Sequence, residues 1–197
     1  MSLNVSNLSV LEDGTKEWRL NGKRHNENGP AVIWADGYKA WYINGKRHNE
    51  NGPAIIWSNG DKLWYINGEL HNENGPAVIA IDGTKAWYIN GELHNENGPA
   101  VIAIDGTKAW FINGELHNEN GPAVIWTDGE KEWYIKGEKM SKKEFLIYKK
   151  LRDKYSLLGV PVRDKWRVRE IILSWYDNPR FKCVQKRLER ECIKLYK

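Results

Sequence analysis

The chain has 197 residues, of which 41% are hydrophobic, and this composition is typical of a folded protein and excludes an intrinsically disordered one. The formal net charge of +4 hides an asymmetry, because residues 1–135 carry a charge of −7 and residues 136–197 carry +11. Such a division predicts separate partners for the two parts, or an acidic part that shields a basic one. The sequence contains no apolar run long enough to span a bilayer.

The cysteines and the N-terminal residues indicate a reducing compartment. Cys183 and Cys192 lie nine residues apart in a predicted helix, which is too far along the helix axis for a disulfide. Residues 1–8 lack the basic segment and the continuous apolar segment of a secretory signal. We therefore expect a cytoplasmic protein.

Residues 1–12 alternate apolar and polar side chains around Val5, Leu8 and Val10, which predicts an N-terminal cap strand that covers the first repeat. Residues 13–138 then repeat with a period of 23 residues, so the chain is an array of one small unit. Each unit contains His-Asn-Glu-Asn-Gly-Pro-Ala. The five histidines are His25, His48, His71, His94 and His117.

Two hairpin signals occur in every unit. Asn-Gly pairs such as Asn44-Gly45 and Asp-Gly pairs such as Asp36-Gly37 favour two-residue hairpin loops, in which both residues have positive φ. These turns predict antiparallel strands, and two strands per unit would lengthen the array by roughly 10 Å per repeat. The sequence predicts a mainly β protein with an elongated single antiparallel sheet of stacked hairpin repeats and a small α-helical C-terminal cap.

An aromatic pair marks the first strand of each unit. Tryptophan recurs six times at this position, and Tyr or Phe follows it in all units except the first. Successive side chains of a strand point to opposite faces, so Trp and Tyr should form two stripes. Exposed aromatic stripes usually mark interfaces. The candidate partner-binding residues are Trp41, Trp64, Trp87, Trp110, Tyr42, Tyr65, Tyr88 and Phe111.

These residues carry a family resemblance. Residues 41–48 read Trp-Tyr-Ile-Asn-Gly-Lys-Arg-His, followed by Gly52 and by a second turn before the next aromatic pair. This pattern resembles MORN (membrane occupation and recognition nexus) repeats over roughly residues 12–138. It departs from them where Ala40 or Glu132 precedes the aromatic pair, a position at which that family usually has Gly, and where Asn49 replaces a common Gly.

This divergent pattern is similar to that of the repeat arrays carried by proteins of bacteriophages and giant viruses. The resemblance implies a single sheet of stacked hairpins that acts as a binding scaffold, and it implies no enzyme. A viral protein of this kind would act in the host cytoplasm, for example by binding and inhibiting a host defence protein. We expect a non-enzymatic scaffold or inhibitor with a protein partner, and self-association into a homo-oligomer stays open.

The histidines and the glutamates two residues after them form a ladder. A metal site needs several ligands at about 2 Å from one ion, whereas neighbouring rungs would lie roughly 10 Å apart. A catalytic site needs one preorganised constellation, whereas the same His and Glu pair recurs in all five copies. We expect no metal, cofactor or catalytic residue. The alternative that we favour is a loop in which His and asparagines such as Asn26 and Asn28 bind backbone groups.

Residues 139–197 lose the period and form a predicted three-helix domain. The capping box Ser141 to Glu144 begins a helix over residues 141–155. A second helix follows Asp164 and runs from residue 166 to 175, and Pro179 opens a third that extends to about residue 195. We interpret this basic domain as a cap on the end of the sheet.

A basic patch on the last two helices supports the alternative function, which is binding of nucleic acid or another acidic surface. The contrasting interpretation is a solvated helical face, and the density of apolar side chains around Trp166 and Trp175 favours the cap. The patch consists of Arg163, Lys165, Arg167, Arg169, Lys182, Lys186, Arg187 and Arg190.

Overall fold

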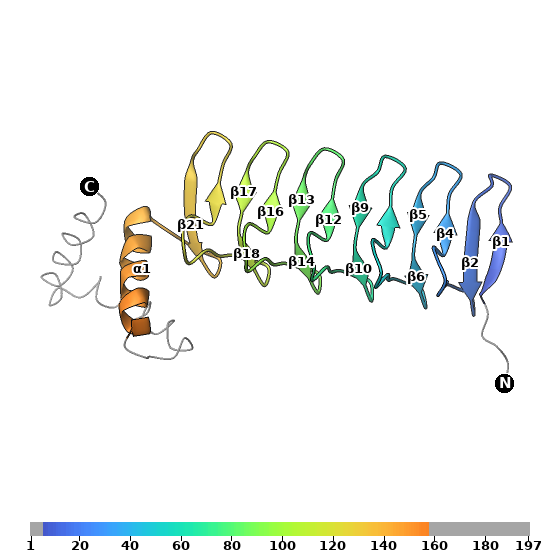
Figure 1. Ribbon diagram of the computed structural model, residues 1–197, viewed down its shortest axis with the longest axis horizontal. Helices are drawn as coiled ribbons and strands as arrows, with labels where there is room; N and C mark the ends of the chain where they lie inside the picture. Colours follow the sequence, from blue (N-terminus) through green and yellow to red (C-terminus); the bar gives the residue numbers. More distant parts are fainter. Residues whose placement is uncertain (1–5, 158–197) are drawn as a thin grey trace, which may run out of the picture.

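The computed structural model describes residues 6–157, which form an elongated array of hairpins with a helix at its C-terminal end (Figure 1). Most strands belong to one long antiparallel sheet, in which the strands pair in order along the array and β3 pairs with β2 beside this path. The predicted fold class is therefore confirmed. The strands of this sheet are β1 (Asn7–Val10), β2 (Lys16–Leu20), β3 (Lys23–Arg24), β4 (Val32–Ile33), β5 (Lys39–Ala40), β8 (Ile55–Ile56), β9 (Lys62–Leu63), β12 (Val78–Ile79), β13 (Lys85–Ala86), β16 (Val101–Ile102), β17 (Lys108–Ala109), β20 (Val124–Ile125), β21 (Lys131–Ile135) and β22 (Glu138–Met140).

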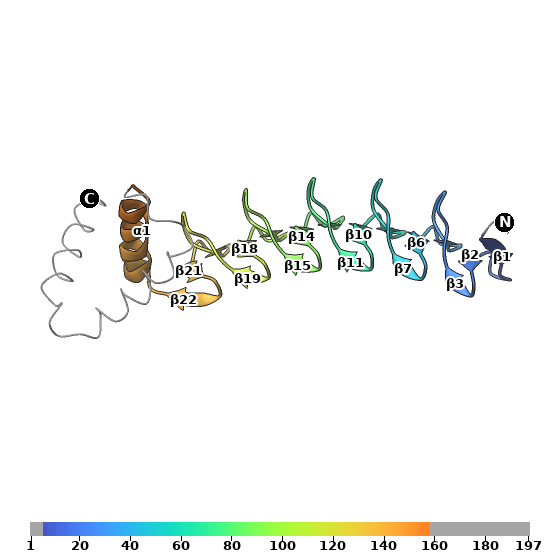
Figure 2. The ribbon, with the colours of Figure 1, turned by 90° about the horizontal axis from the view of Figure 1, so that it is seen from below.

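Four short hairpins stand beside the long sheet, one for each internal repeat. In each of them the chain leaves the sheet at a tryptophan, such as Trp41 between β5 and the first of these hairpins. Figure 2 shows that the hairpins project to one side of the array. They pair β6 (Tyr42–Ile43) with β7 (Lys46–Arg47), β10 (Tyr65–Ile66) with β11 (Glu69–Leu70), β14 (Tyr88–Ile89) with β15 (Glu92–Leu93) and β18 (Phe111–Ile112) with β19 (Glu115–Leu116).

The Asn-Gly turns have the predicted geometry. Asn44 and Gly45 have φ values of 52° and 83°, and the corresponding residues of the other repeats are also left-handed. Asparagine and glycine tolerate this region better than other residues, because asparagine can bond its own backbone and glycine has no Cβ. The prediction of two-residue turns at these positions is confirmed.

The Asp-Gly turns differ from the prediction. Gly37 has a φ of 94°, but Asp36 is not left-handed. The N–H of Trp34 donates to the carbonyl of Tyr38 at 2.9 Å, so the loop contains three residues and ends in a bulge at the glycine. Carboxylate Oδ1 of Asp36 accepts the N–H of Tyr38 at 2.9 Å, which holds this longer loop. The prediction of a two-residue loop here was wrong.

The most deeply buried side chains of the array are small. Alanine recurs immediately before the second strand of each repeat and is completely buried there, because its backbone bonds to both neighbouring strands and leaves little room. Ala31, for example, donates to the carbonyl of Ala40 and accepts from the N–H of Trp18, both at 2.8 Å. The large aromatic residues, by contrast, are mostly half-buried, since a one-layer sheet has no second layer to cover them.

The two ends of the array are formed by different elements, a strand at one end and a helix at the other. At the N-terminal end β1 pairs with β2, and all four of its side chains are exposed. At the other end, α1 (Lys142–Leu157) packs Phe145 and Tyr148 against Ile135. Ser141 and Glu144 form the predicted capping box, so the first predicted helix is confirmed. The second and third predicted helices lie outside the described residues.

Candidate binding surfaces of the repeat array

Between β2 and β21, one face of the long sheet is apolar except for a glutamate on each of these two strands. Residues that pair directly across antiparallel strands share a face, and the pairing register from β2 to β21 joins eleven residues in one row. We call it the valine face. Its members are Glu17, Val32, Ala40, Ile55, Leu63, Val78, Ala86, Val101, Ala109, Val124 and Glu132.

The opposite face alternates lysine with isoleucine. Each lysine of this lysine face is exposed, and each isoleucine is half-buried. The face was not predicted from the sequence, although a lysine two residues before each tryptophan was a signal for it. The lysines are Lys16, Lys39, Lys62, Lys85, Lys108 and Lys131, and the isoleucines paired with them are Ile33, Ile56, Ile79, Ile102 and Ile125.

All eight aromatic residues predicted to bind a partner are half-buried. Tyr42 and Tyr65 pack against the buried cluster of Val32 and Ile55 on the valine face. The guanidinium of Arg24 lies 5.5 Å from the ring centroid of Tyr42, and Arg47 stands in the same relation to Tyr65 at 5.2 Å. These rings therefore join neighbouring repeats, and only part of each is open to another molecule.

More strongly exposed apolar side chains lie elsewhere, at the Asp-Gly turns. Three tryptophans next to these turns are each about two-fifths exposed, and in the two repeats where alanine replaces Trp an isoleucine follows it and is exposed by 67% or more. We call this row the turn edge. It consists of Trp34, Trp57, Ile81, Ile104 and Trp126. The sequence signal for the turn edge was that an isoleucine occupies the next position wherever alanine replaces the tryptophan.

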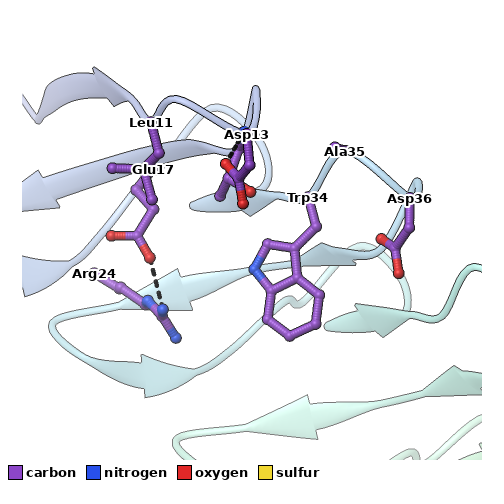
Figure 3. A pocket seen from close by; sticks show the side chains of 8 residues that line it. Leu11, Asp13, Glu17, Arg24, Trp34, Ala35 and Asp36 are labelled. Carbon is purple, nitrogen blue, oxygen red and sulfur yellow. Dashed lines mark hydrogen bonds and ion pairs between the residues drawn. The ribbon is translucent and has the colours of Figure 1, made fainter.

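A pocket of about 440 Å³ lies beside the first two turns (Figure 3). Glu17, Arg24 and Trp34 are among its lining residues. Burial opposes ionisation of Glu17, but hydrogen bonds from Arg24 (2.6 Å) and Arg19 (2.8 Å) outweigh it and hold the pKa of this carboxylate below its usual range. Beside the pocket, two guanidinium groups therefore share the Glu17 carboxylate, and this cluster carries a net positive charge.

The histidines connect successive repeats. Nδ1 of His48 accepts the backbone N–H of Asn67 at 3.1 Å, and the other four histidines make the same bond to the residue 19 positions later. An accepting Nδ1 leaves the proton on Nε2, which faces the glutamate two residues on at 3.5–3.8 Å. The favoured interpretation of histidine as a backbone-bonding loop residue is confirmed.

The loop after each histidine is held by its first asparagine. Nδ2 of Asn49 donates to the carbonyl of Pro53 at 2.9 Å, and its Oδ1 accepts the N–H of Asn51 at 3.1 Å. We call residues 26–28, 49–51, 72–74, 95–97 and 118–120 the acidic loops. Their central residues are Glu27, Glu50, Glu73, Glu96 and Glu119. The acidic loops lie at the opposite end of the strands from the turn edge, since they connect the short hairpins to the next sheet strand.

The basic patch predicted from the sequence, from Arg163 to Arg190, lies outside the described residues. Within residues 6–157, no group of three or more His, Cys, Asp or Glu side chains is placed to hold a metal ion. The described helix is not long and apolar enough to cross a membrane.

The fold and these surfaces define the chain as an array of β-hairpin repeats. Comparison with models of known protein families found no match, and no curated protein matches the chain. The resemblance to MORN repeats therefore rests on the quoted motifs of this sequence.

Proposed function

We propose that this protein is a non-enzymatic binding scaffold whose turn edge binds another protein. The observation that carries this proposal is the row of large apolar side chains that the turn edge exposes along the array, from Trp34 to Trp126. Exposed apolar side chains gathered on one surface are typical of protein interfaces, and tryptophan is enriched among the residues that dominate binding energy.

The recurrence of the polar groups supports binding in preference to catalysis. The His and Glu side chains that could transfer protons occur once in every repeat, with the same contact between the two each time. Nδ1 of each histidine is already used to bond the next repeat. A repeated surface with one period suits a long partner or several copies of a small one.

Affinity capture with matched variants tests the proposal. The tagged parent protein and a triple variant, Trp57→Ser, Ile81→Ser and Ile104→Ser, would be incubated with cell extract, and bound proteins identified by mass spectrometry. A control variant, Lys62→Ser, Lys85→Ser and Lys108→Ser, changes the lysine face in the same repeats. We expect a protein that the parent and the control capture and the turn-edge variant does not. Equal capture by all three would contradict the role of the turn edge.

A further inference from the structure

One of the five acidic loops is occupied within the chain itself. Helix α1 lies against the last loop, and the exposure of the Glu119 side chain is only 32%. The equivalent side chains of Glu27, Glu50, Glu73 and Glu96 are 76–78% exposed. The five loops share the sequence His-Asn-Glu-Asn-Gly-Pro, so the occupied loop shows what the four open ones can bind.

The occupied loop receives an arginine. Nη1 of Arg152 donates to the carbonyl oxygen of Glu119 at 2.6 Å and lies 3.2 Å from its carboxylate Oε2. Asp153 holds the same guanidinium in place through Nε and Nη2, at 2.9 and 2.8 Å. The loop thus offers a carbonyl and a carboxylate of one residue to one guanidinium, which is a planar donor suited to two acceptors.

Two neighbouring groups of α1 complete the contact. The hydroxyl of Tyr148 donates to Oε1 of Glu119 at 3.4 Å, and Nζ of Lys149 lies 3.4 Å from the carbonyl of Asn120. Burial and the charge of Glu119 raise the pKa of Tyr148 to about 12, so the hydroxyl keeps its proton at neutral pH. The helix presents Tyr and Arg four residues apart, on the same side.

The four open loops have the same internal bonds as the occupied one. The first asparagine of each donates to the proline carbonyl at 2.9 Å, against 2.8 Å in the last loop. Their shape therefore does not depend on α1. A cavity of about 170 Å³ between the second and third loops is lined by Glu50, Glu73, Trp64 and His71, and it leaves room for a side chain.

We propose that the open acidic loops bind arginine side chains of a partner protein, one guanidinium per loop, in the way that the last loop binds Arg152. The loops succeed one another at roughly 10 Å, since each repeat adds two strands to the sheet. Arginines seven residues apart in a helix are separated by about 10.5 Å and match this spacing. The partner is therefore a basic helical segment. The net charge of −7 on residues 1–135 favours its approach.

This inference deepens the proposed scaffold function, on which it rests, but it uses a different surface from the turn edge. If arginine peptides did not bind the acidic loops, the capture of a protein by the turn edge would still stand. If the turn edge captured no protein, the binding of arginine peptides to the loops could still be measured.

The test measures, by fluorescence anisotropy, the binding of two labelled helical peptides of about 22 residues to the full chain, one with four arginines and one with four lysines spaced seven residues apart. The loop variant carries Glu27→Gln, Glu50→Gln, Glu73→Gln and Glu96→Gln. The control variant carries Glu12→Gln, Glu69→Gln, Glu92→Gln and Glu115→Gln, which removes an equal number of carboxylate charges from exposed positions outside the loops. Thermal unfolding of both variants would show that they keep the fold. Sedimentation of each protein alone would show whether it self-associates.

We expect the parent to bind the arginine peptide more tightly than the lysine peptide, and the loop variant to bind the arginine peptide about tenfold more weakly, because it lacks four exposed ion pairs. The control should lose less than about threefold, since its charges act only at long range. Equal losses in both variants, equal affinity for both peptides, or no binding by the parent would overturn the proposal. Self-association that the loop variant loses would assign the loops to a second copy of the chain and would also overturn it.

Discussion

The ring of His71 accepts a hydrogen bond from the backbone N–H of Asn90 in the next repeat, with 3.2 Å between Nδ1 and the amide nitrogen. Asn90 has a φ of 49°, so its N–H lies in the tight turn of the next hairpin. The histidine therefore fixes the position of one hairpin relative to its neighbour. The bond recurs in all five repeats, with Lys136 as the donor in the last.

Replacing His71 by alanine removes this acceptor and leaves the turn N–H of Asn90 without its partner. We expect the free energy of unfolding to fall by about 1–2 kcal/mol. Urea unfolding followed by tryptophan fluorescence would measure the loss. The matched control is Glu73→Ala, because the exposed Glu73 carboxylate lies 3.6 Å from the same ring and should contribute less than about 0.5 kcal/mol. Equal losses in both variants would contradict the structural role of the ring.

The last histidine gives the stability of the array a pH dependence. Burial lowers the pKa of His117 below 6.5, although the charge of Glu119 opposes the shift. The unfolded chain then binds a proton more readily than the folded one. The contribution of the neutral ring is therefore complete above about pH 6.5 and is lost as the pH falls through the folded-state pKa.

The variant His117→Gln keeps an acceptor oxygen and removes the titrating group. We expect its urea midpoint to fall less between about pH 7.5 and about pH 5 than the midpoint of the parent, because one proton-linked loss is absent. A variant midpoint that falls as much as the parent midpoint would show that His117 does not contribute to the acid sensitivity.

Replacement by alanine should change the stability of the protein differently at two neighbouring glycines, Gly45 and Gly52. Gly45 has a φ of 83°, where a side chain is strained, so Gly45→Ala should cost about 1–2 kcal/mol of stability. Gly52 is not left-handed, and an added Cβ would meet only Nδ2 of Asn49 at 3.7 Å. Gly52→Ala should therefore change stability by less than about 0.5 kcal/mol or increase it. Urea unfolding of the two variants tests this order, and a larger loss at Gly52 would contradict it.

The array should tolerate the loss of a whole unit. Residues 69–91 and 92–114 differ only at Tyr88 and Phe111, so an in-frame deletion of residues 69–91 leaves the same neighbours in contact. We expect a soluble, shorter array that unfolds cooperatively, measured by circular dichroism. Deletion of residues 69–80 is the control, because it removes half a unit and breaks the strand pairing. If the whole-unit deletion were as insoluble as the half-unit one, stability would not be distributed over the repeats.

Turn chemistry explains why so much of the fold was predictable. Asn44 and Gly45 adopt left-handed φ through properties of their own backbone and side chains, so the hairpin is encoded by adjacent residues. The capping box of Ser141 and Glu144 is equally local. The period of 23 residues then repeats one hairpin along the chain, and the antiparallel sheet results from that repetition.

The surfaces were harder to predict, because exposure depends on neighbours that are distant in the chain. Trp41 and Trp57 are both tryptophans next to a strand, yet the first is half-buried and the second more open. The exposure of a tryptophan therefore does not follow from residue type alone. The three-residue loop at Asp36 is by contrast a local feature, because its carboxylate bonds the N–H of Tyr38 two positions on.

By itself the sequence determined the unit, its period, the strand direction and the start of the helix, since each depends on residues adjacent in the chain. Only the tertiary structure decided that each histidine bonds a residue 19 positions later, in the next repeat, and that Arg152 reaches Glu119 across 33 residues. It also decided which apolar side chains face solvent, because in a one-layer sheet a side chain is covered only by the repeats stacked beside it. Those contacts depend on how the units are stacked in space.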